Sequence, residues 1–171
     1  MKYLLILALL LTHLPSMAGK QEQELALIGE GNATYLLFRV YKAKLYAPPD
    51  TPQERLLDIE VPKRLTLEYK IAISREDIEK AAWQILQRQH PEDVLETLRP
   101  AVDRLHQAMQ SVEPGQRYTL DYRRDGQLTL YFNDAVVAQF QDPVLAQVYF
   151  GIWLAHPPLS DRLRAQLTGT L

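Results

Sequence analysis

Residues 65–73 alternate between large apolar side chains and polar or small ones, and this pattern constrains the fold more than any other feature of the chain. The apolar positions are Leu65, Leu67, Tyr69, Ile71 and Ile73, with Thr66, Glu68, Lys70 and Ala72 between them. A period of two is typical of a β-strand with one buried and one solvated face, as in antiparallel sheets. The chain is therefore expected to contain an antiparallel sheet that is covered on one side.

Two further strands are predicted before this run, at residues 24–28 and 36–46. Gly29 and Gly31 lie between them and indicate a sharp bend. Within residues 36–46 the apolar side chains change parity, which predicts a bulge or a strand covered on both faces. The proline-rich segment 48–52 ends the second strand, because proline cannot donate to a strand ladder.

Three short strands are predicted later in the chain, at residues 118–122, 128–132 and 136–140. The pairs Asp125-Gly126 and Asn133-Asp134 separate them, and both pairs are typical of tight hairpin turns. This part of the chain is therefore expected to form a three-stranded meander.

Helices are predicted between and after the two groups of strands. Ser74 is a suitable N-cap, and apolar residues between 78 and 86 recur at helical spacing. A second helical stretch begins at Pro91, and Pro100 is expected to break it in two. Asp142-Pro143 and Ser160 are expected to begin two helices near the C-terminus.

The order of elements is strands, helices, a meander and helices again, which indicates the α+β class. The predicted architecture is an antiparallel sheet with helices packed on one face. Residues 19–171 suffice for one sizeable core, and no internal repeat or second domain is evident.

The first 18 residues have the pattern of a secretory signal peptide. Lys2 gives a positive start, residues 3–14 are largely apolar, and Ser16-Met17-Ala18 is a small-x-Ala exit. The apolar run is shorter than the roughly 20 residues of a membrane-spanning helix. We therefore expect cleavage after Ala18, a periplasmic or secreted protein, and no stable membrane insertion after cleavage. A retained membrane anchor is the alternative.

Composition excludes several classes of function. The net charge is −2 for the whole chain, and removal of residues 1–18, which contain one lysine and no acid, makes it −3. A nearly neutral chain gives no electrostatic reason to expect nucleic acid as a partner. The chain has no cysteine, so thiolate metal sites and disulfides are excluded.

Two segments far apart in the sequence indicate a family. The first is Gly29-Glu30-Gly31-Asn32-Ala33 followed by Val40-Tyr41 and Leu45-Tyr46, and the second is Phe150-Gly151-Ile152-Trp153-Leu154 before Pro157-Pro158-Leu159. Together they resemble the chalcone isomerase-like proteins, in particular the small exported bacterial members. The resemblance covers nearly all of residues 19–171 and implies the open-faced β-sandwich of that fold.

The resemblance also implies where a catalytic cleft would lie. In true chalcone isomerases an arginine and a threonine on strands, with a tyrosine and an asparagine on a helix, stabilise negative charge on the substrate oxygens. The resemblance implies that these four positions correspond to Ala33, Tyr41, Ile78 and Ile85. Loss of one such hydrogen-bond donor typically costs about 2.7–4 kcal/mol of transition-state stabilisation. The isomerase mechanism is therefore not expected here, and no catalytic residue is assigned.

A cleft without catalytic groups can still bind a ligand, and related plant members of the fold bind fatty acids. The leading hypothesis is a non-catalytic protein that binds a small apolar ligand such as a fatty acid. The candidate binding residues are Arg39, Tyr41, Tyr69, Ile78, Trp83 and Ile85. The same residues equally suit a core without a pocket, because apolar residues at strand or helix period are core residues by default.

Two other functions stay open at this point. One is an intramolecular lyase or isomerase acting on a chalcone-like substrate, with Tyr41 as acid and Arg39 as oxyanion partner. The other is a structural or assembly role, for which the sequence names no partner protein. No cofactor is expected, and His90, His106 and His156 show no metal-ligand spacing.

Overall fold

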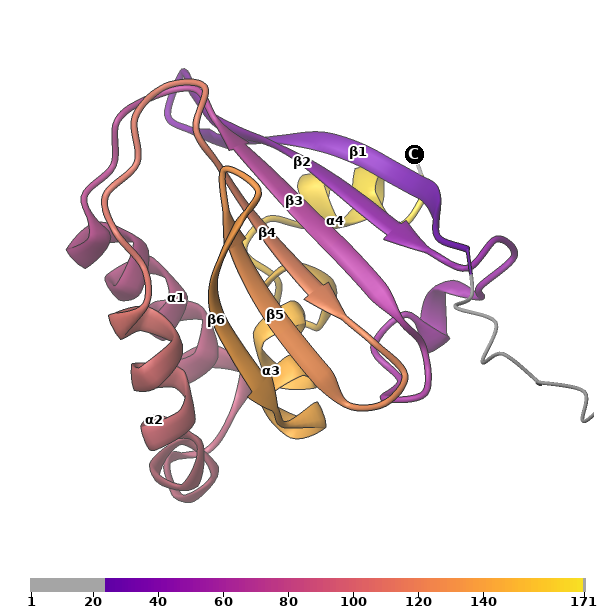
Figure 1. Cartoon of the computed structure of the whole chain (residues 1–171). Coiled ribbons are helices and arrows are strands. Elements are labelled where there is room, and N and C mark those ends of the chain that lie inside the picture. The colour runs from indigo at the N-terminus through magenta and orange to yellow at the C-terminus, as the bar shows by residue number, and fades with distance from the viewer. Residues whose placement is uncertain (1–23, 171) are drawn as a thin grey trace, which may run out of the picture.

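A computed structural model describes residues 24–170 as one six-stranded antiparallel sheet with helices on one face (Figure 1). The strands are paired in chain order: β1 (Ala26–Tyr35), β2 (Phe38–Ala47), β3 (Lys63–Tyr69), β4 (Arg117–Tyr122), β5 (Gln127–Phe132) and β6 (Ala135–Gln141). The helices are α1 (Arg75–Gln89), α2 (Glu92–Gln107), α3 (Pro143–Leu154) and α4 (Asp161–Leu167), and a short 3-10 turn, η1, spans Gln53–Arg55. The predicted α+β class and one-sided helix layer are confirmed.

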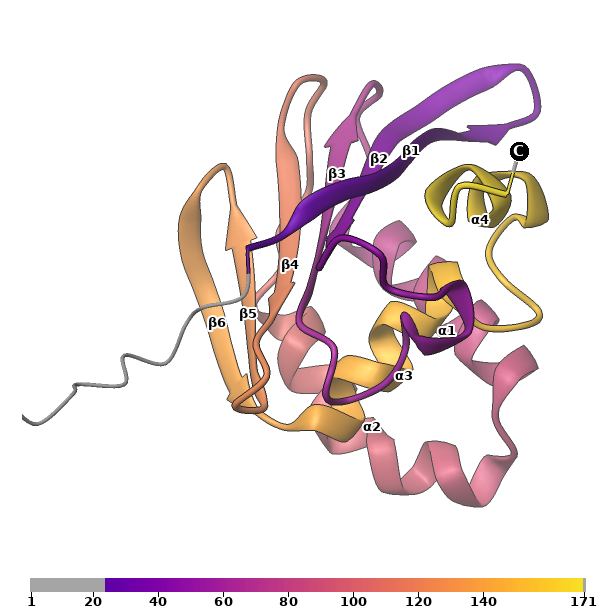
Figure 2. The same ribbon diagram turned by 90° about the vertical axis from the view of Figure 1, so that its right-hand side faces the viewer.

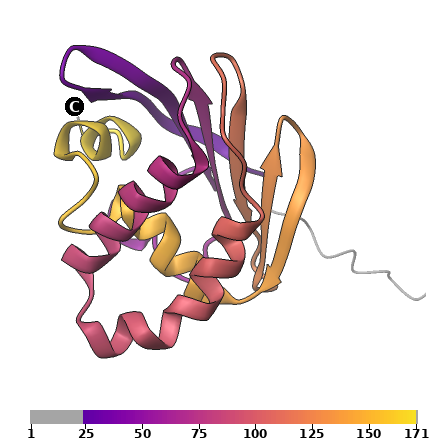
Figure 3. The same ribbon diagram turned by 90° about the vertical axis from the view of Figure 1, so that its left-hand side faces the viewer.

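Helix α3 is the centre of the helical layer. It packs on the sheet at β5 and contacts α1 and α2 with its other side (Figures 2 and 3). Nine of its twelve residues are buried, so the helix is apolar around its whole circumference. A helix that is apolar on all sides is expected to lie inside a domain rather than on its surface.

The predicted bend at Gly29 and Gly31 is wrong, because both glycines lie inside the long strand β1. The chain reverses at Leu36 and Leu37 instead. The predicted bulge is confirmed, since the register between β1 and β2 shifts between the pairs Ala33–Tyr41 and Thr34–Arg39. This irregularity accounts for the change of apolar parity along β2.

The two glycines allow helix α4 to approach strand β1 closely. A Cβ atom on Gly29 would lie within 3.0 Å of the backbone of Gln166 and Leu167. A Cβ atom on Gly31 would lie within 3.0 Å of the side chains of Gln166 and Leu163. The Gly-x-Gly motif therefore serves helix–strand packing at the edge of the sheet.

The predicted helix starts are confirmed by their caps. The side chains of Ser74, Asp142 and Ser160 accept hydrogen bonds from the backbone N–H groups of Asp77, Leu145 and Leu163. The two predicted turns of the meander are also present. Gly126 has a φ of 88°, while Asn133 and Asp134 have φ values of 46° and 72°. These turns use the residue types that tolerate positive φ best.

Two predicted boundaries differ from the structure. Helix α2 continues through Pro100, so the predicted break is wrong. Pro100 lies on an exposed side of that helix, where water can solvate the carbonyl that loses its N–H partner. The alternating run 65–73 ends as a strand at Tyr69, and Ile73 forms only an isolated bridge with Val112.

The predicted signal peptide, residues 1–18, lies outside the described residues. Within residues 24–170, no helix combines the length and the apolar character that crossing a membrane requires.

Candidate binding site

A row of aromatic side chains crosses the helix-covered face of the sheet near one end. It begins beside Ala33 on β1, which pairs with Tyr41 on β2, and Tyr41 pairs with Tyr69 on β3. The rings of Tyr41 and Tyr69 meet edge to face with their centroids 5.5 Å apart. Tyr118 on β4 continues the row at 6.3 Å, and Phe132 on β5 follows at 5.0 Å. We call Tyr41, Tyr69, Tyr118 and Phe132 the aromatic row.

The helical layer places further aromatic and polar groups against this row. Trp153 on α3 donates a hydrogen bond from Nε1 to the hydroxyl of Tyr41 over 2.8 Å. One turn earlier on α3, the ring of Tyr149 lies 6.2 Å from that of Trp153. Tyr149 also forms a hydrogen bond of 3.1 Å with Nε2 of His106 on α2. The row and the helices together enclose a largely apolar region that contains several hydroxyl groups.

Three of the five buried tyrosines in the described part of the chain use their hydroxyl protons within the protein. Tyr118 donates to the carbonyl of Gln110, and Tyr122 donates to the carbonyl of Ile59. Tyr149 has two partners for its hydroxyl, Nε2 of His106 at 3.1 Å and Sδ of Met109, to which it donates over 3.9 Å. These hydroxyls fulfil the usual requirement that a buried polar group finds a partner.

The other two buried tyrosines, Tyr41 and Tyr69, differ from these three. The hydroxyl of Tyr41 only accepts a hydrogen bond, from Trp153, and the hydroxyl of Tyr69 forms none with any residue between 24 and 170. Burial raises the pKa of both phenols well above the ordinary value for tyrosine, so both carry their protons at neutral pH. Each hydroxyl therefore retains a proton that it could donate to a ligand atom.

No buried cation lies near these two phenols in the described residues. The buried basic side chains are Lys63 and His106. Lys63 begins β3 and Tyr69 ends it, which separates the two by roughly 20 Å at the usual rise of a strand. Burial, more than the nearby Arg75 guanidinium, lowers the pKa of His106 to about 4, so its imidazole is neutral.

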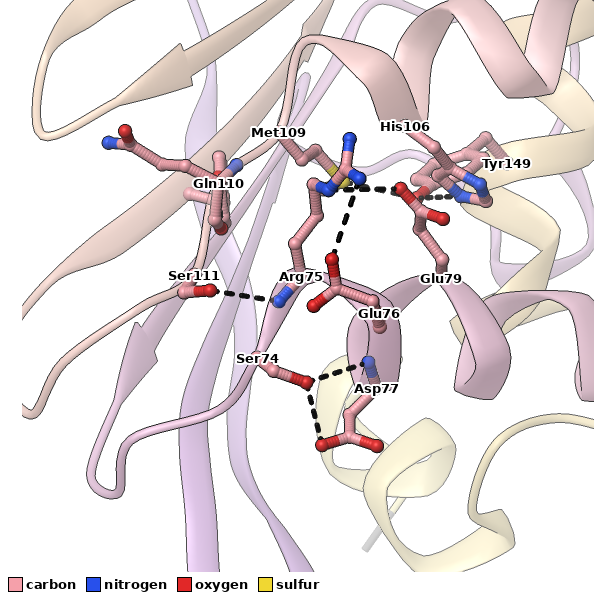
Figure 4. Close-up of polar contacts among 11 residues, drawn as sticks. Ser74, Arg75, Glu76, Asp77, Glu79, His106, Met109, Gln110, Ser111 and Tyr149 are labelled. Atoms are coloured by element: carbon pink, nitrogen blue, oxygen red, sulfur yellow. Dashed lines mark hydrogen bonds and ion pairs between the residues drawn. The ribbon is translucent and has the colours of Figure 1, made fainter.

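The start of α1 carries a network of polar contacts next to the His106–Tyr149 pair (Figure 4). The backbone N–H of Arg75 donates to the hydroxyl of Ser111, and the guanidinium of Arg75 pairs with Glu79 at 3.5 Å. This network ties the start of α1 to the segment that follows α2. It closes the helical layer beside the His106–Tyr149 pair.

The structure places the six predicted binding residues in three different environments: the buried core, its partly buried edge and, for Arg39, the exposed surface. Tyr41, Tyr69 and Ile85 belong to the buried core, and Ile78 and Trp83 are partly buried against it. Ile78 and Ile85 lie on α1, so one helix carries both positions that the resemblance assigned to a tyrosine and an asparagine.

Trp83 and Arg39 do not join the two phenols in a single cluster. The ring of Trp83 contacts His106 at 6.2 Å, and the guanidinium of Arg99 lies 4.6 Å above it. Arg39 is exposed near the start of β2, and no described residue forms an ion pair with it.

Sequence reasoning missed the role of Trp153 as the hydrogen-bond partner of Tyr41. Its inward position follows from the helical spacing of the apolar residues in α3, but its partner depends on how α3 crosses the sheet. An inward tryptophan four residues after an inward tyrosine was the available signal, since a buried indole N–H requires an acceptor.

The opposite face of the sheet is polar and solvated. Lys42 pairs with Glu30 at 2.7 Å, Arg64 pairs with Asp121 at 2.8 Å, and Arg117 pairs with Asp134. An open trough of about 580 Å³ lies over these strands. Because its charges are largely paired, this face has the character of a solvated surface. Between residues 24 and 170, no group of three or more His, Cys, Asp or Glu side chains is placed to hold a metal ion.

Comparison with known proteins agrees with this architecture. The chain belongs to the chalcone isomerase-like family, whose pattern it matches over residues 12–169. The fold is similar to the crystal structure of a fatty-acid binding protein from Arabidopsis thaliana, with a TM-score of 0.65. That similarity covers 85% of this chain and 87% of the plant protein at 13% sequence identity, so it concerns the fold. No curated protein is significantly similar in sequence.

Proposed function

We propose that the protein is an exported, non-catalytic binder of a small apolar molecule with one hydrogen-bond-accepting group, such as a fatty acid. The observation that carries this proposal is the pair Tyr41 and Tyr69. Both phenols are buried in apolar surroundings, their rings touch, and neither donates its proton to a described residue. Each hydroxyl therefore keeps a proton for which a ligand oxygen is a suitable acceptor.

The side chains around the two phenols support binding rather than catalysis. Ala33, Ile78 and Ile85 stand where the family resemblance expects an arginine, a tyrosine and an asparagine. None of the three can stabilise negative charge that develops on a substrate oxygen. Arg39, the candidate replacement for the missing arginine, is exposed, whereas Tyr41 is buried.

The lack of a buried cation beside the phenols, among the described residues, also limits the protonation state of the ligand. A carboxylate held only by neutral donors in an apolar site would carry a large desolvation cost. A fatty acid is therefore expected to bind as the neutral acid, with its carbonyl oxygen accepting from both Tyr41 and Tyr69. The name of the Arabidopsis structure, a fatty-acid binding protein, supports this class of ligand for the fold.

Export is part of the proposal. The first 18 residues have the charge, length and exit pattern of a secretory signal peptide. N-terminal sequencing of the protein recovered from a secreting host tests this directly. A new N-terminus at Gly19 is expected, and an intact Met1 in a membrane fraction would contradict export in a cleaved form.

The binding test uses delipidated protein and a mixture of fatty acids, with retained ligands identified by native mass spectrometry. A one-to-one complex is expected. The Tyr41→Phe variant should bind about tenfold more weakly, the usual loss for one hydrogen bond to a polar ligand group. Tyr46→Phe is the matched control, because Tyr46 lies on the same strand and lines the opposite, polar face. Absence of any retained ligand in the unmodified protein would contradict the proposal.

A second assay separates binding from catalysis. Cyclisation of a hydroxychalcone by the purified protein is expected to proceed at the rate in buffer alone. Cyclisation faster than buffer that disappears in Tyr41→Phe would instead indicate an intramolecular lyase that uses this phenol as its acid.

A further inference from the structure

The turn between β1 and β2 exposes four consecutive large apolar side chains. The exposed fractions are 72% for Tyr35, 77% for Leu36, 95% for Leu37 and 67% for Phe38. In Figures 2 and 3 this turn lies at the outer end of the sheet, beyond helix α4. We call these four residues the hairpin tip.

The hairpin tip departs from ordinary turn chemistry. Leu36 has a φ of 53°, a region that glycine or asparagine occupies at lower cost. The other turns of the sheet do use such residues, at Gly126 and at Asn133-Asp134. Leucine at the tip therefore gives neither a favourable turn nor buried apolar surface. An exposed apolar group that contributes nothing to the fold indicates an external contact.

The shape of the tip fits a lipid surface better than a second copy of the chain. A specific protein interface buries about 800 Å² on each partner, whereas four such side chains offer on the order of 500 Å². The tip is also a narrow projection rather than a flat face. A narrow apolar projection can enter a bilayer without needing a complementary surface.

The order of side chains along the tip matches the layers of a membrane interface. Leu36 and Leu37 form the turn, and the facing pair Tyr35 and Phe38 flanks it. Leucine and phenylalanine favour the acyl region, while the amphipathic ring of tyrosine favours the headgroup level. The next residue, Arg39, is exposed and has no ion pair among residues 24–170, so it is placed to meet lipid phosphate.

Further along β2 the exposed surface becomes polar. Lys42 pairs with Glu30 there, which sets a limit to how deeply the hairpin can enter. We propose that the hairpin tip inserts into the surface of a phospholipid bilayer and holds the protein there reversibly. This inference goes beyond the proposed ligand binding and does not depend on it, because bilayer contact requires no bound fatty acid.

The two sites are nevertheless close along the chain. Val40, two residues after the tip, packs against the core, and Tyr41 follows it inside. If the proposed function holds, this arrangement gives an apolar ligand a short path from the bilayer to the two phenols.

The test measures binding of the processed protein to vesicles in the absence of fatty acid, with the same N-terminus in every variant. The probes are vesicles of phosphatidylcholine alone and of phosphatidylcholine mixed equally with phosphatidylglycerol. The double variant Leu36→Gly and Leu37→Ser keeps a favourable turn and should lower the partition coefficient by at least about tenfold. Arg39→Gln should lower it about fivefold on the anionic vesicles only.

A matched control removes exposed apolar side chains elsewhere. Val136 and Val144 are 53% and 55% exposed, on β6 and at the start of α3. The double variant Val136→Ser and Val144→Ser should change the partition coefficient by less than about twofold. Equal losses in the two double variants would overturn the proposal, because binding would then follow general surface apolarity. Failure of the unmodified protein to bind either vesicle would overturn it as well.

Insertion can also be observed at the tip itself, because the chain has no cysteine. A polarity-sensitive dye on Leu37→Cys should shift to the blue when vesicles are added, and the same dye on Glu96→Cys, exposed on α2, should not. A dimer in solution that forms without vesicles and is abolished by the Leu36→Gly and Leu37→Ser changes would assign the tip to a second copy instead. If the unmodified protein binds vesicles but no fatty acid, the proposed function is contradicted and this inference still stands.

Discussion

Two groups of buried polar side chains lie at opposite ends of strand β3. The donors at one end have acceptors inside the protein, and the hydroxyl donors at the other end have none among the described residues. At the start of the strand, Lys63 donates from Nζ to the carbonyl of Asp58 over 2.8 Å, and its charge faces the rings of Tyr122 and Phe150. At the other end, the hydroxyl of Tyr69 donates to no described residue, and the hydroxyl of neighbouring Tyr41 only accepts. Donors engaged inside the protein stabilise its fold, whereas donors without a partner are available to a ligand.

The largest expected effect on stability is at the start of β3, where the donors have acceptors inside the protein. We call this the engaged end of the strand. Lys63→Ala removes a hydrogen bond, two contacts of the cation with aromatic rings and the packing of a fully buried chain. The free energy of unfolding should fall by about 2–4 kcal/mol, measured by urea denaturation. Fatty-acid affinity of the folded variant should be unchanged. A variant of full stability with weakened ligand binding would reverse the assignment of the two ends.

The second prediction concerns acid. The folded-state pKa of His106 is lowered to about 4, below the ordinary 6.5, so the unfolded chain binds more protons between these values. Stability from this group is present above about pH 6.5 and is lost as the pH falls toward 4. Asp103 opposes the shift and Arg75 adds to it.

Over that range the loss should be on the order of 3 kcal/mol, from unfolding curves at a series of pH values. His106→Leu, which removes the titrating group, should have a flatter dependence on pH. Equal slopes for the two proteins would show that His106 does not contribute.

The third effect is smaller and also falls at the engaged end. Tyr122 donates to the carbonyl of Ile59 over 2.8 Å, so Tyr122→Phe leaves that carbonyl without its partner. The free energy of unfolding should fall by about 1 kcal/mol, with no change in ligand affinity. Thermal unfolding followed by circular dichroism is a suitable measurement.

The smallest effect on stability is expected at the other end. Tyr69→Phe removes a hydroxyl that has no partner among the described residues, so the free energy of unfolding should change by less than about 0.5 kcal/mol or rise slightly. Ligand affinity should nevertheless fall several-fold. A loss of stability as large as that of Tyr122→Phe would show that the Tyr69 hydroxyl is engaged in the fold.

Much of this architecture could be predicted from local sequence patterns. Alternation along residues 65–69 placed Leu67 and Tyr69 on the buried face, and the caps at Ser74 and Asp142 located two helices. These signals depend only on neighbours in the chain. Their physical causes, burial of one strand face and satisfaction of helix N–H groups, act over a few residues.

Features set by contacts between distant segments could not be predicted in this way. The reason for Gly29 and Gly31 is the approach of α4, more than 130 residues later, and the partner of Tyr41 is Trp153. The exposure of Leu36 and Leu37 also contradicts their apolar character, so sequence patterns counted them within a strand. In each case the role of the residue depends on which distant segment packs against it, and this is set only when the sheet and the helices assemble.

The central claim is that Tyr41 and Tyr69 donate to the head group of a bound apolar ligand. The most direct measurement is the carboxyl resonance of a carbon-13 labelled fatty acid bound to the protein. We expect one bound resonance that moves in both Tyr41→Phe and Tyr69→Phe and stays in place in Tyr46→Phe. A bound resonance that is the same in all four proteins would contradict the claim.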